Sequence, residues 1–317
     1  MDFKTFAVEQ FDKIAQEKGY NFDIESSTGF CGRFQVDGFN HLIIGADLGL
    51  NSSSSQRVSN DKFFTNFFLR KDNINVIESL CVVEISEIDL TDINYPVIVK
   101  PNLGLGGNGV LLVYNSEDLL HGFSIAKNFS NTILIQEYIE KPEFRIVIFN
   151  ERVYVCYHRN HFVITGDGLS SIKLLIEARN ETVKKRHQVS LSDEKLSFKL
   201  KQLGLTLEYV PQKNENLKLF DAANLKMGGT WADVTGKCHK KYFELADRCA
   251  KSLGLTIAGI DLFADSIEIF DEDYKIIEVN SNPGFEYFRS EEKILAKLFS
   301  DIEEYVQKLH SKKISIG

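Results

Sequence analysis

The sequence predicts a protein of the α+β or mixed α/β class. Apolar residues recur at helical spacing near both ends of the chain, whereas short apolar runs of strand length dominate residues 97–157. Glycines and other turn residues separate these runs, as expected for neighbouring strands joined by tight connections. No internal repeat is present, so the elements are expected to pack into ordinary domains rather than a repeat array.

The first elements are expected to be a helix and two strands. Residues 3–18 carry apolar side chains on one helical face, and Gly19 supplies a stop signal. Strands follow at Gly32–Val36 and His41–Gly45. The polar run Asn51–Arg57 is typical of a surface loop or linker; the alternative is a site whose hydroxyls and Arg57 bind a substrate carboxylate.

The remaining elements are predicted from the same signals. Asp61 opens an amphipathic helix over 61–70, and Ser116 caps a helix over 117–128. Further helices are expected at 170–179, 239–253 and 291–310, and strands at Val97–Lys100, Val110–Tyr114, Ile133–Gln136, Arg145–Phe149, Val153–Tyr157, Thr256–Ala264 and Lys275–Val279. Residues 181–202 are charged and weakly patterned, which leaves a helix and a mobile excursion both open.

Composition limits the function classes. The chain has 317 residues, which predicts about two domains. Lys and Arg total 37 against 45 Asp and Glu, so the net charge is −8. Nucleic-acid surfaces rely on clustered positive charge. We therefore expect no nucleic-acid partner, although a local basic pocket for a small polyphosphate remains open.

Segments that address proteins to membranes or to secretion are not expected. The first residues lack the basic and apolar regions of a signal peptide, and the longest apolar runs fall far short of the roughly 20 residues that span a bilayer. The cysteines are scattered without metal-ligand or redox spacing: Cys31, Cys81, Cys156, Cys238 and Cys249. We expect a cytoplasmic protein with reduced cysteines and no membrane partner.

A lysine at the end of a buried strand precedes a glycine-rich loop. Lys100 is followed by Gly104, Gly106, Gly107 and Gly109, and then by a second strand. Glycines let backbone N–H groups approach phosphate oxygens, and the lysine adds a point charge. Neither a Walker A loop nor a Rossmann fingerprint fits, because no GK[ST] closes the loop and a strand follows it. The alternative is a glycine-rich hairpin with an incidental lysine.

Hard oxygen ligands interrupt two apolar strands near the other end of the chain. Glu278 and Asn280 are two residues apart on one predicted strand, so they point to the same face. Asp261 lies on a nearby predicted strand. Carboxylate and amide oxygens suit Mg²⁺, which takes one or two carboxylates together with substrate phosphates. The alternative is an edge strand with solvated acids.

Several segments together follow the order and spacing of a known family. They are Asp61-Lys62 with Thr65 and Leu69, the lysine and glycine loop at 99–110, Gln136-Glu137-Tyr138-Ile139, Thr165-Gly166-Asp167-Gly168, Ala223-Asn224-Leu225 with Gly228-Gly229-Thr230, Gly259-Ile260-Asp261 and Glu278-Val279-Asn280. Over about residues 55–290 the chain resembles the ATP-grasp carboxylate–amine ligases. The likeness is greatest to the ATP-grasp module of cyanophycin synthetases and of bifunctional glutathione synthetases.

The resemblance implies a fold and a division into domains. The implied architecture is the ATP-grasp fold, in which two α+β subdomains grip ATP, with a small N-terminal α/β domain added. The N-terminal domain would comprise residues 1–60. Residues 61–132 would form the first subdomain with the glycine-rich loop, and residues 133–317 the second subdomain with the metal site.

The resemblance also implies residue roles. Lys62 and Lys100 would contact the ATP phosphates under a lid formed by Gly104–Gly109. Adenine would be held by Gln136, Glu137, Tyr138 and Ile139, and the ribose by Glu143. Two Mg²⁺ ions, with Mn²⁺ as an alternative, would be held by Asp261, Glu278 and Asn280. Arg145 and Arg159 stand where basic residues of the family face the phosphate or acyl group.

The chain departs from the pattern at the positions that concern the substrate. Phe220 and Asp221 stand where the cyanophycin group has arginines, Gly106 replaces a histidine, and Lys226 replaces a serine. These changes leave nucleotide binding intact but put the substrate carboxylate's identity in doubt. Lys226 is the candidate that restores the lost positive charge, so we assign it a catalytic role beside Arg145 and Arg159.

The implied activity is ADP-forming ligation of amino-acid-like or peptide substrates. A substrate carboxylate would take the γ-phosphoryl group, and an amine would then displace phosphate from the acyl carbon. Small-molecule acids and amines are the expected partners, and the resemblance admits a homodimer. Three alternatives stay open: a glutathione-synthetase-like ligase, a non-catalytic nucleotide-binding regulatory protein, and a phosphotransferase.

Overall fold

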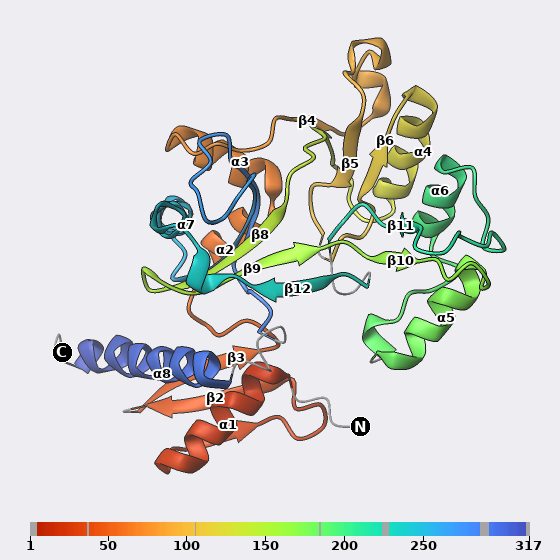
Figure 1. Ribbon diagram of the computed structural model, residues 1–317. Coiled ribbons are helices and arrows are strands. Elements are labelled where there is room, and N and C mark those ends of the chain that lie inside the picture. The colour runs from red at the N-terminus through yellow and green to blue at the C-terminus, as the bar shows by residue number, and fades with distance from the viewer. Residues whose placement is uncertain are drawn as a thin grey trace.

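The computed structural model describes residues 5–36, 38–104, 106–183, 185–223, 228–285 and 292–314. Helices and antiparallel sheets are mixed along these residues, which confirms the α+β class. The described strands form sheets of five, four and three strands and one two-stranded pair. In Figure 1 the largest sheet lies in the middle of the molecule, the second above it and the third below it.

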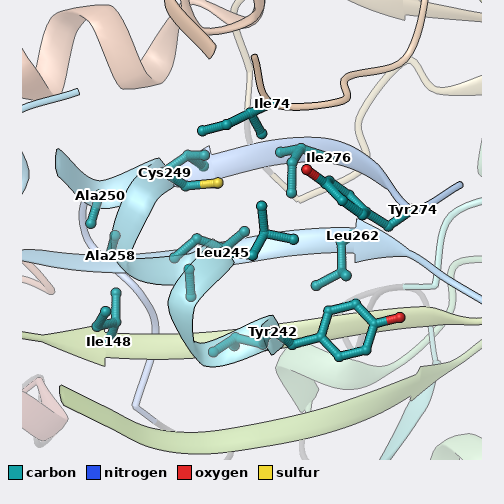
Figure 2. Close-up of a cluster of buried hydrophobic side chains, with 14 of the residues drawn as sticks. Ile74, Ile148, Tyr242, Leu245, Cys249, Ala250, Ala258, Leu262, Tyr274 and Ile276 are labelled. Carbon is teal, nitrogen blue, oxygen red and sulfur yellow. The ribbon is translucent and has the colours of Figure 1, made fainter. Parts of the chain in front are cut away.

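The central sheet separates two hydrophobic cores. Its strands in spatial order are β12 (Thr230–Asp233), β9 (Arg152–Asn160), β8 (Glu143–Phe149), β13 (Ile257–Phe263) and β14 (Lys275–Asn280), all antiparallel to their neighbours. Helix α7 (Lys240–Ser252) covers one face, and Figure 2 shows Leu245 of this helix over Ala258 and Leu262 of β13. The predicted helix at 239–253 is confirmed, with His239 as its N-cap.

The opposite face of the central sheet packs against both ends of the chain. Helices α1 (Phe6–Lys18) and α8 (Glu292–Ile314) share this core with the small sheet. The strands of that sheet are β1 (Phe22–Ile24), β2 (Cys31–Val36) and β3 (Phe39–Ile44). Phe11 of α1 and Phe299 of α8 meet edge to face, with ring centroids 5.6 Å apart. Among the described residues, none of the helices, α8 included, is apolar enough over enough length to cross a membrane.

The four-stranded sheet has one covered face and one open face. Its strands in spatial order are β4 (Ser79–Val82), β7 (Ile133–Glu137), β5 (Val97–Pro101) and β6 (Leu111–Val113). Helix α4 (Ser116–Lys127) covers one face, where it buries Leu119 and Phe123 against Val97 and Val99. The predicted capping residue is off by one position, because Asn115 rather than Ser116 accepts the N–H of Asp118.

The polar run at 51–57 is not a loop, which corrects the expectation from composition. Helix α2 (Ser53–Asn60) begins there, and the Ser52 side chain accepts the N–H of Ser55 as its N-cap. Two of its serines bond to distant backbone: Ser55 donates to the Gly254 carbonyl and Ser59 to that of Val279. Arg57 stays exposed. Tertiary hydrogen bonds therefore stabilise a helix whose sequence alone favours a loop.

A further layer is built from residues 160–223. Helices α5 (Ile172–Thr182) and α6 (Glu194–Gln202) pack with strands β10 (Val163–Thr165) and β11 (Asn216–Lys218) around Ile176 and Leu196. Part of the ambiguous segment 181–202 is thus helical. This layer is bonded to the outer edge of β6: Gln202 donates to the Leu112 carbonyl at 2.9 Å, and Asp221 accepts the Leu112 N–H at 3.2 Å.

One buried side chain ties the start of α2 to the central sheet. The Asn51 amide donates to the carbonyls of Ile257 and Ser281, and its oxygen accepts from the N–H groups of Thr256 and Ile257. Helix α3 (Lys62–Lys71) follows α2 directly, with Asp61 as its N-cap. Asn51 thereby fixes the position of the start of α2, and with it the path of the chain into α3, whose first residue is Lys62.

We expect Asn51→Ala to lower the free energy of unfolding by about 2–4 kcal/mol, because it leaves several buried backbone groups without partners. Urea denaturation followed by circular dichroism measures the change. Asn131→Ala is the matched control: this asparagine is exposed, so the same substitution should change stability by less than about 0.5 kcal/mol. Equal losses of stability in the two variants would contradict a stabilising role for the Asn51 side-chain hydrogen bonds.

Candidate functional site

A cavity of about 420 Å³ is lined by residues of both larger sheets. The two-residue period of a strand explains how the four-stranded sheet contributes to it. In β5, Val97 and Val99 face the α4 core, so Ile98 and Lys100 face the cavity. In β7, Ile133 and Ile135 face the same core, so Gln136 lies on the cavity side opposite Ile98.

The central sheet supplies polar side chains by the same rule. Along β8, Val147 and Phe149 belong to the core beneath α1 and α8. Glu143 and Arg145 lie on that same face, nearer the start of the strand. Asp261 pairs with Arg145 in the register of β8 and β13, and with Glu278 in the register of β13 and β14. One sheet face is therefore apolar at one end and ionic at the other.

Asp261 is the centre of a buried ionic network. It is 1% exposed, and its carboxylate accepts both the Nε and an Nη of Arg145. Arg159 of β9 donates to the same carboxylate at 2.9 Å and to Glu143 at 2.6 Å. Because each buried charge has an opposite partner with charge-assisted hydrogen bonds, the network is compatible with burial.

Glu278 links this network to Lys62. Its carboxylate lies 3.5 Å from the Arg145 guanidinium and 4.0 Å from the Lys62 amine. Asn280 donates from its amide to Glu278 at 3.0 Å. Burial raises the pKa of Glu278, but Lys62 and Arg145 outweigh burial and hold that pKa well below its usual range. Glu278 is therefore a carboxylate at neutral pH.

Two other cavity groups have shifted pKa values. Burial, helped by the positive charge of Lys62, lowers the pKa of Lys100 to about 8. Burial raises the pKa of Glu143 above its usual range, and Arg159 opposes only part of that change. Desolvated groups of this kind gain most from a ligand of opposite charge.

The glycine-rich loop is attached to helix α3. The Lys62 amine donates to the carbonyls of Asn102 and Gly104 at 3.3 and 3.2 Å. The side-chain oxygen of Asn102 accepts the N–H of Phe63. The first turn of α3 and the loop therefore hold one another, with Lys62 at the junction.

The cavity brings together most of the residues singled out in the sequence. They are Lys62, Lys100, Gly104, Gly106, Gly107, Gln136, Glu137, Tyr138, Ile139, Glu143, Arg159, Asp261 and Glu278. Arg145 and Asn280 do not line it but bond to Asp261 and Glu278. Lys226 lies outside the described residues.

Gly109 is placed by backbone geometry rather than by the cavity. Its φ is +67°, and a Cβ there would lie 2.9 Å from the Phe129 ring and 3.0 Å from Pro101. A side chain would therefore be strained and would also clash. Gly109 closes the hairpin between β5 and β6, whereas Gly104, Gly106 and Gly107 line the cavity.

Sequence reasoning missed a set of cavity residues from the layer at 160–223. His161, Lys218 and Asp221 all line the cavity. Asp221 also accepts a hydrogen bond from buried Lys199 at 2.6 Å. Asp221, which stands where the family has an arginine, is therefore neutralised by a neighbouring lysine. The available signal was that departure at 221. Phe220, the other departure, is buried in the core of this layer instead.

The donor set fits a magnesium ion in part. Glu278 and Asn280 offer a carboxylate and an amide oxygen on neighbouring positions of one strand face, as Mg²⁺ requires when phosphate oxygens complete its shell. Both oxygens of Asp261 already accept from arginines. Among the described residues, no three His, Cys, Asp or Glu side chains cluster as a metal site by themselves. Glu278 and Asn280 are therefore the better-fitting ligands.

Comparison with protein families gives matches in two segments. Residues 61–158 match the family described as the carbamoyl-phosphate synthase L chain, ATP binding domain, and residues 220–302 match the RimK-like ATP-grasp domain. The first segment contains Lys62, Lys100 and Gln136, and the second contains Asp261 and Glu278.

Curated relatives are much longer proteins. The glutathione biosynthesis bifunctional protein GshAB of Clostridium perfringens is 29% identical over 77% of this chain and 34% of its own length. A cyanophycin synthetase of Trichormus variabilis is 32% identical over 60% of this chain and 22% of its own length. The chain thus spans about a third or less of the length of these relatives.

A solved structure shares the fold. The bifunctional glutathione synthetase from Pasteurella multocida superposes with a TM-score of 0.55 at 20% identity, over 88% of this chain and 40% of that one. The predicted ATP-grasp fold is confirmed by this likeness and by the two family matches. The chain therefore has the ATP-grasp fold and is a relative of the ATP-grasp ligases, among them the bifunctional glutathione proteins and the cyanophycin synthetases.

Proposed function

We propose that the chain is an ADP-forming ligase that joins a carboxylate to an amine through an acyl phosphate. The observation that carries the proposal is the convergence of three groups of side chains in one cavity or directly behind its wall. Lys62 and Lys100 supply positive charge, Glu278 and Asn280 supply oxygen ligands, and Arg145 and Arg159 supply guanidinium groups beside them. Phosphoryl transfer requires this kind of charge neutralisation around the moving group.

The nucleotide would occupy the part of the cavity that extends from Gln136 to Lys62 and Lys100. The Gln136 amide nitrogen is buried and has no hydrogen-bond partner among the residues that the structure describes, so we expect it to donate to a ring nitrogen of a purine. Glu137, Tyr138 and Ile139 follow it along the cavity wall. Ile98 and Phe263 add apolar lining, which suits a flat aromatic base, and Glu143 would accept hydrogen bonds from the ribose hydroxyls.

In the first step a substrate carboxylate oxygen bonds to the γ-phosphorus while the bond to the β-phosphate oxygen breaks, which releases ADP. Lys62 and Lys100 would hold the phosphates against their mutual repulsion and orient them in line. Magnesium, held by Glu278 and Asn280 with one further contact from Asp261, would neutralise phosphate charge. That last contact requires Asp261 to share its oxygens with the arginines.

In the second step the amine bonds to the acyl carbon and phosphate leaves, and the amine gives up one proton. Arg145 and Arg159 would stabilise the charge on the acyl phosphate, and Lys226 is the further cation we assign to that end. The acyl phosphate hydrolyses readily, so the loop at Gly104–Gly107 would exclude water while it lasts. No nucleophilic side chain is needed.

The proposal extends to the setting of the reaction. We propose ATP and Mg²⁺ (two ions, with Mn²⁺ as an alternative), small carboxylate and amine substrates, no nucleic acid or membrane partner, and a cytoplasmic location. We retain the division at residues 60 and 132 as a working description of the domains. A glutathione-synthetase-like reaction is the second candidate, because bifunctional glutathione proteins are among the relatives.

The first experiment measures ADP and phosphate release from Mg·ATP with amino acids and dipeptides, offered singly and in pairs. Release that needs a pair, and falls at least about 100-fold in Glu278→Gln, supports the ligase and names both substrates. Glu268→Gln, at an exposed glutamate that does not line the cavity, should keep full activity. Release with one acid alone indicates a phosphotransferase or a leaking acyl phosphate, which hydroxylamine trapping separates. ATP binding without release from any pair would favour the regulatory reading.

We expect the Gln136 amide to strengthen ATP binding without adding to the stability of the protein that lacks nucleotide. Gln136→Met removes a buried donor that lacks a partner, so the free energy of unfolding without nucleotide should stay equal or rise. ATP affinity should fall about 5- to 30-fold, which corresponds to one lost hydrogen bond of about 1–2 kcal/mol. Calorimetric titration and urea denaturation measure the two effects. Gln212→Met, on an exposed residue, should change neither.

Affinity for ATP should depend on pH through Lys100. Its pKa of about 8 means that the amine is charged below pH 8 and neutral above it. Bound phosphates favour the charged form, so affinity should be level near pH 7 and weaken above pH 8 by up to about tenfold per pH unit. Lys100→Arg keeps its charge throughout and should bind with little change between pH 7.5 and 9.5. The same slope in this variant would exclude Lys100 as its source.

A further inference from the structure

Helix α3 has one face that nothing in the described structure covers. Thr65, Asn66 and Leu69 are buried. The opposite side exposes four aromatic side chains, each 40–52% accessible: Phe63, Phe64, Phe67 and Phe68. At about 150–250 Å² for each aromatic side chain, this phenylalanine face presents roughly 300–450 Å² of apolar surface. Patches of that size on a monomer are often functional.

The phenylalanine face contains a hollow. Phe63, Phe67, Arg70 and Lys71 line a depression of about 330 Å³. The hollow is open to the surface, and its size and its two phenylalanines suit an incoming aromatic side chain. The Lys71 amine lies 5.7 Å from the centre of the Phe67 ring at its rim.

The pattern of the face is the same in both directions along the helix. Phe63-Phe64-Thr65-Asn66-Phe67-Phe68 is symmetric in residue class about the point between Thr65 and Asn66. Two copies related by a two-fold axis at that point would pack antiparallel. Phe64 of one copy would then face Phe67 of the other, and Phe68 would face Phe63. An isologous interface needs this self-complementarity, and the hollow is where the two incoming rings would lie.

Charged residues at the two ends of α3 also fit the antiparallel arrangement. Asp61 is opposite Arg70 of the second copy when the helices are antiparallel about that point. Asp61 uses one oxygen to cap α3 at Phe64, and Arg70 is 41% exposed beside Glu78. The antiparallel arrangement also sets the positive end of each helix dipole against the negative end of the other. A second copy thus places one acid opposite one base at each end of the phenylalanine face.

We propose that the phenylalanine face of α3 is a dimer interface, which packs antiparallel against the same face of a second copy of this chain. The inference does not depend on the proposed ligase activity. Lys62, the first residue of the same helix, lines the cavity, so the dimer would also steady the helix that presents this lysine.

Sedimentation velocity at about 1–50 μM tests the association. We expect a species of twice 36.1 kDa for the unaltered chain and a monomer for the double variant Phe64→Glu, Phe67→Glu. Leu169→Glu, at a site that is 86% exposed, is the matched control and should remain dimeric. Unchanged circular dichroism and ATP binding would show that the double variant is folded. A monomeric unaltered chain, or a double variant that stays dimeric, would overturn the proposal.

Cross-linking tests the register in a background where exposed Cys81 is replaced by serine. A Phe64→Cys chain mixed with a Phe67→Cys chain should form a mixed disulfide with oxidised glutathione at least about tenfold faster than either chain alone. Preferential linkage of Phe67→Cys with itself would indicate a parallel pair. No linkage in any mixture would place the interface elsewhere. Either result would reject the antiparallel arrangement.

Discussion

The structure depends on the pairing of one buried carboxylate in the central sheet with two arginines, whose charges oppose the burial that raises its pKa. Asp261 is almost inaccessible and is paired with two arginines from two neighbouring strands. Removing one partner from such a buried pair typically costs about 3–5 kcal/mol, because the remaining charge is uncompensated. Asp261, Arg145 and Arg159 therefore have to stay together, and this requirement fixes the relative register of β9, β8 and β13 at the cavity.

One face of the central sheet packs into an apolar core at one end and carries the ionic network of the cavity at the other. Val147 and Phe149 continue β8 into the core under α1 and α8, so the strand is anchored by apolar packing a few residues from its ionic end. The four-stranded sheet meets that ionic end with its own uncovered face, through Lys100 and Gln136. A cavity with charged walls and a rigid apolar support follows from strand alternation in two sheets.

Hydrogen bonds made by residues of the cavity wall connect parts of the molecule with different roles. Asp221 lines the cavity and bonds to the edge of β6, while Lys62 bonds to the glycine-rich loop. A ligand that changes either contact would also affect the loop or the edge strand. The layer at 160–223 is thus structurally coupled to the site, although residues 181–202 within it are weakly patterned in sequence.

The sequence by itself determined the α+β class, most element positions and the residue types of the site. Period-two alternation and glycine spacing are local properties, and they sufficed for Lys100, Glu278 and the loop at 104–109. Only the tertiary structure decided the helix at 53–60, because its serines are satisfied by backbone of β14 and of the turn after α7. It also decided that Asp221 and Lys218 face the cavity and that Asp261 is shared by two arginines. These outcomes depend on pairings between residues far apart in the chain, and no local pattern records such pairings.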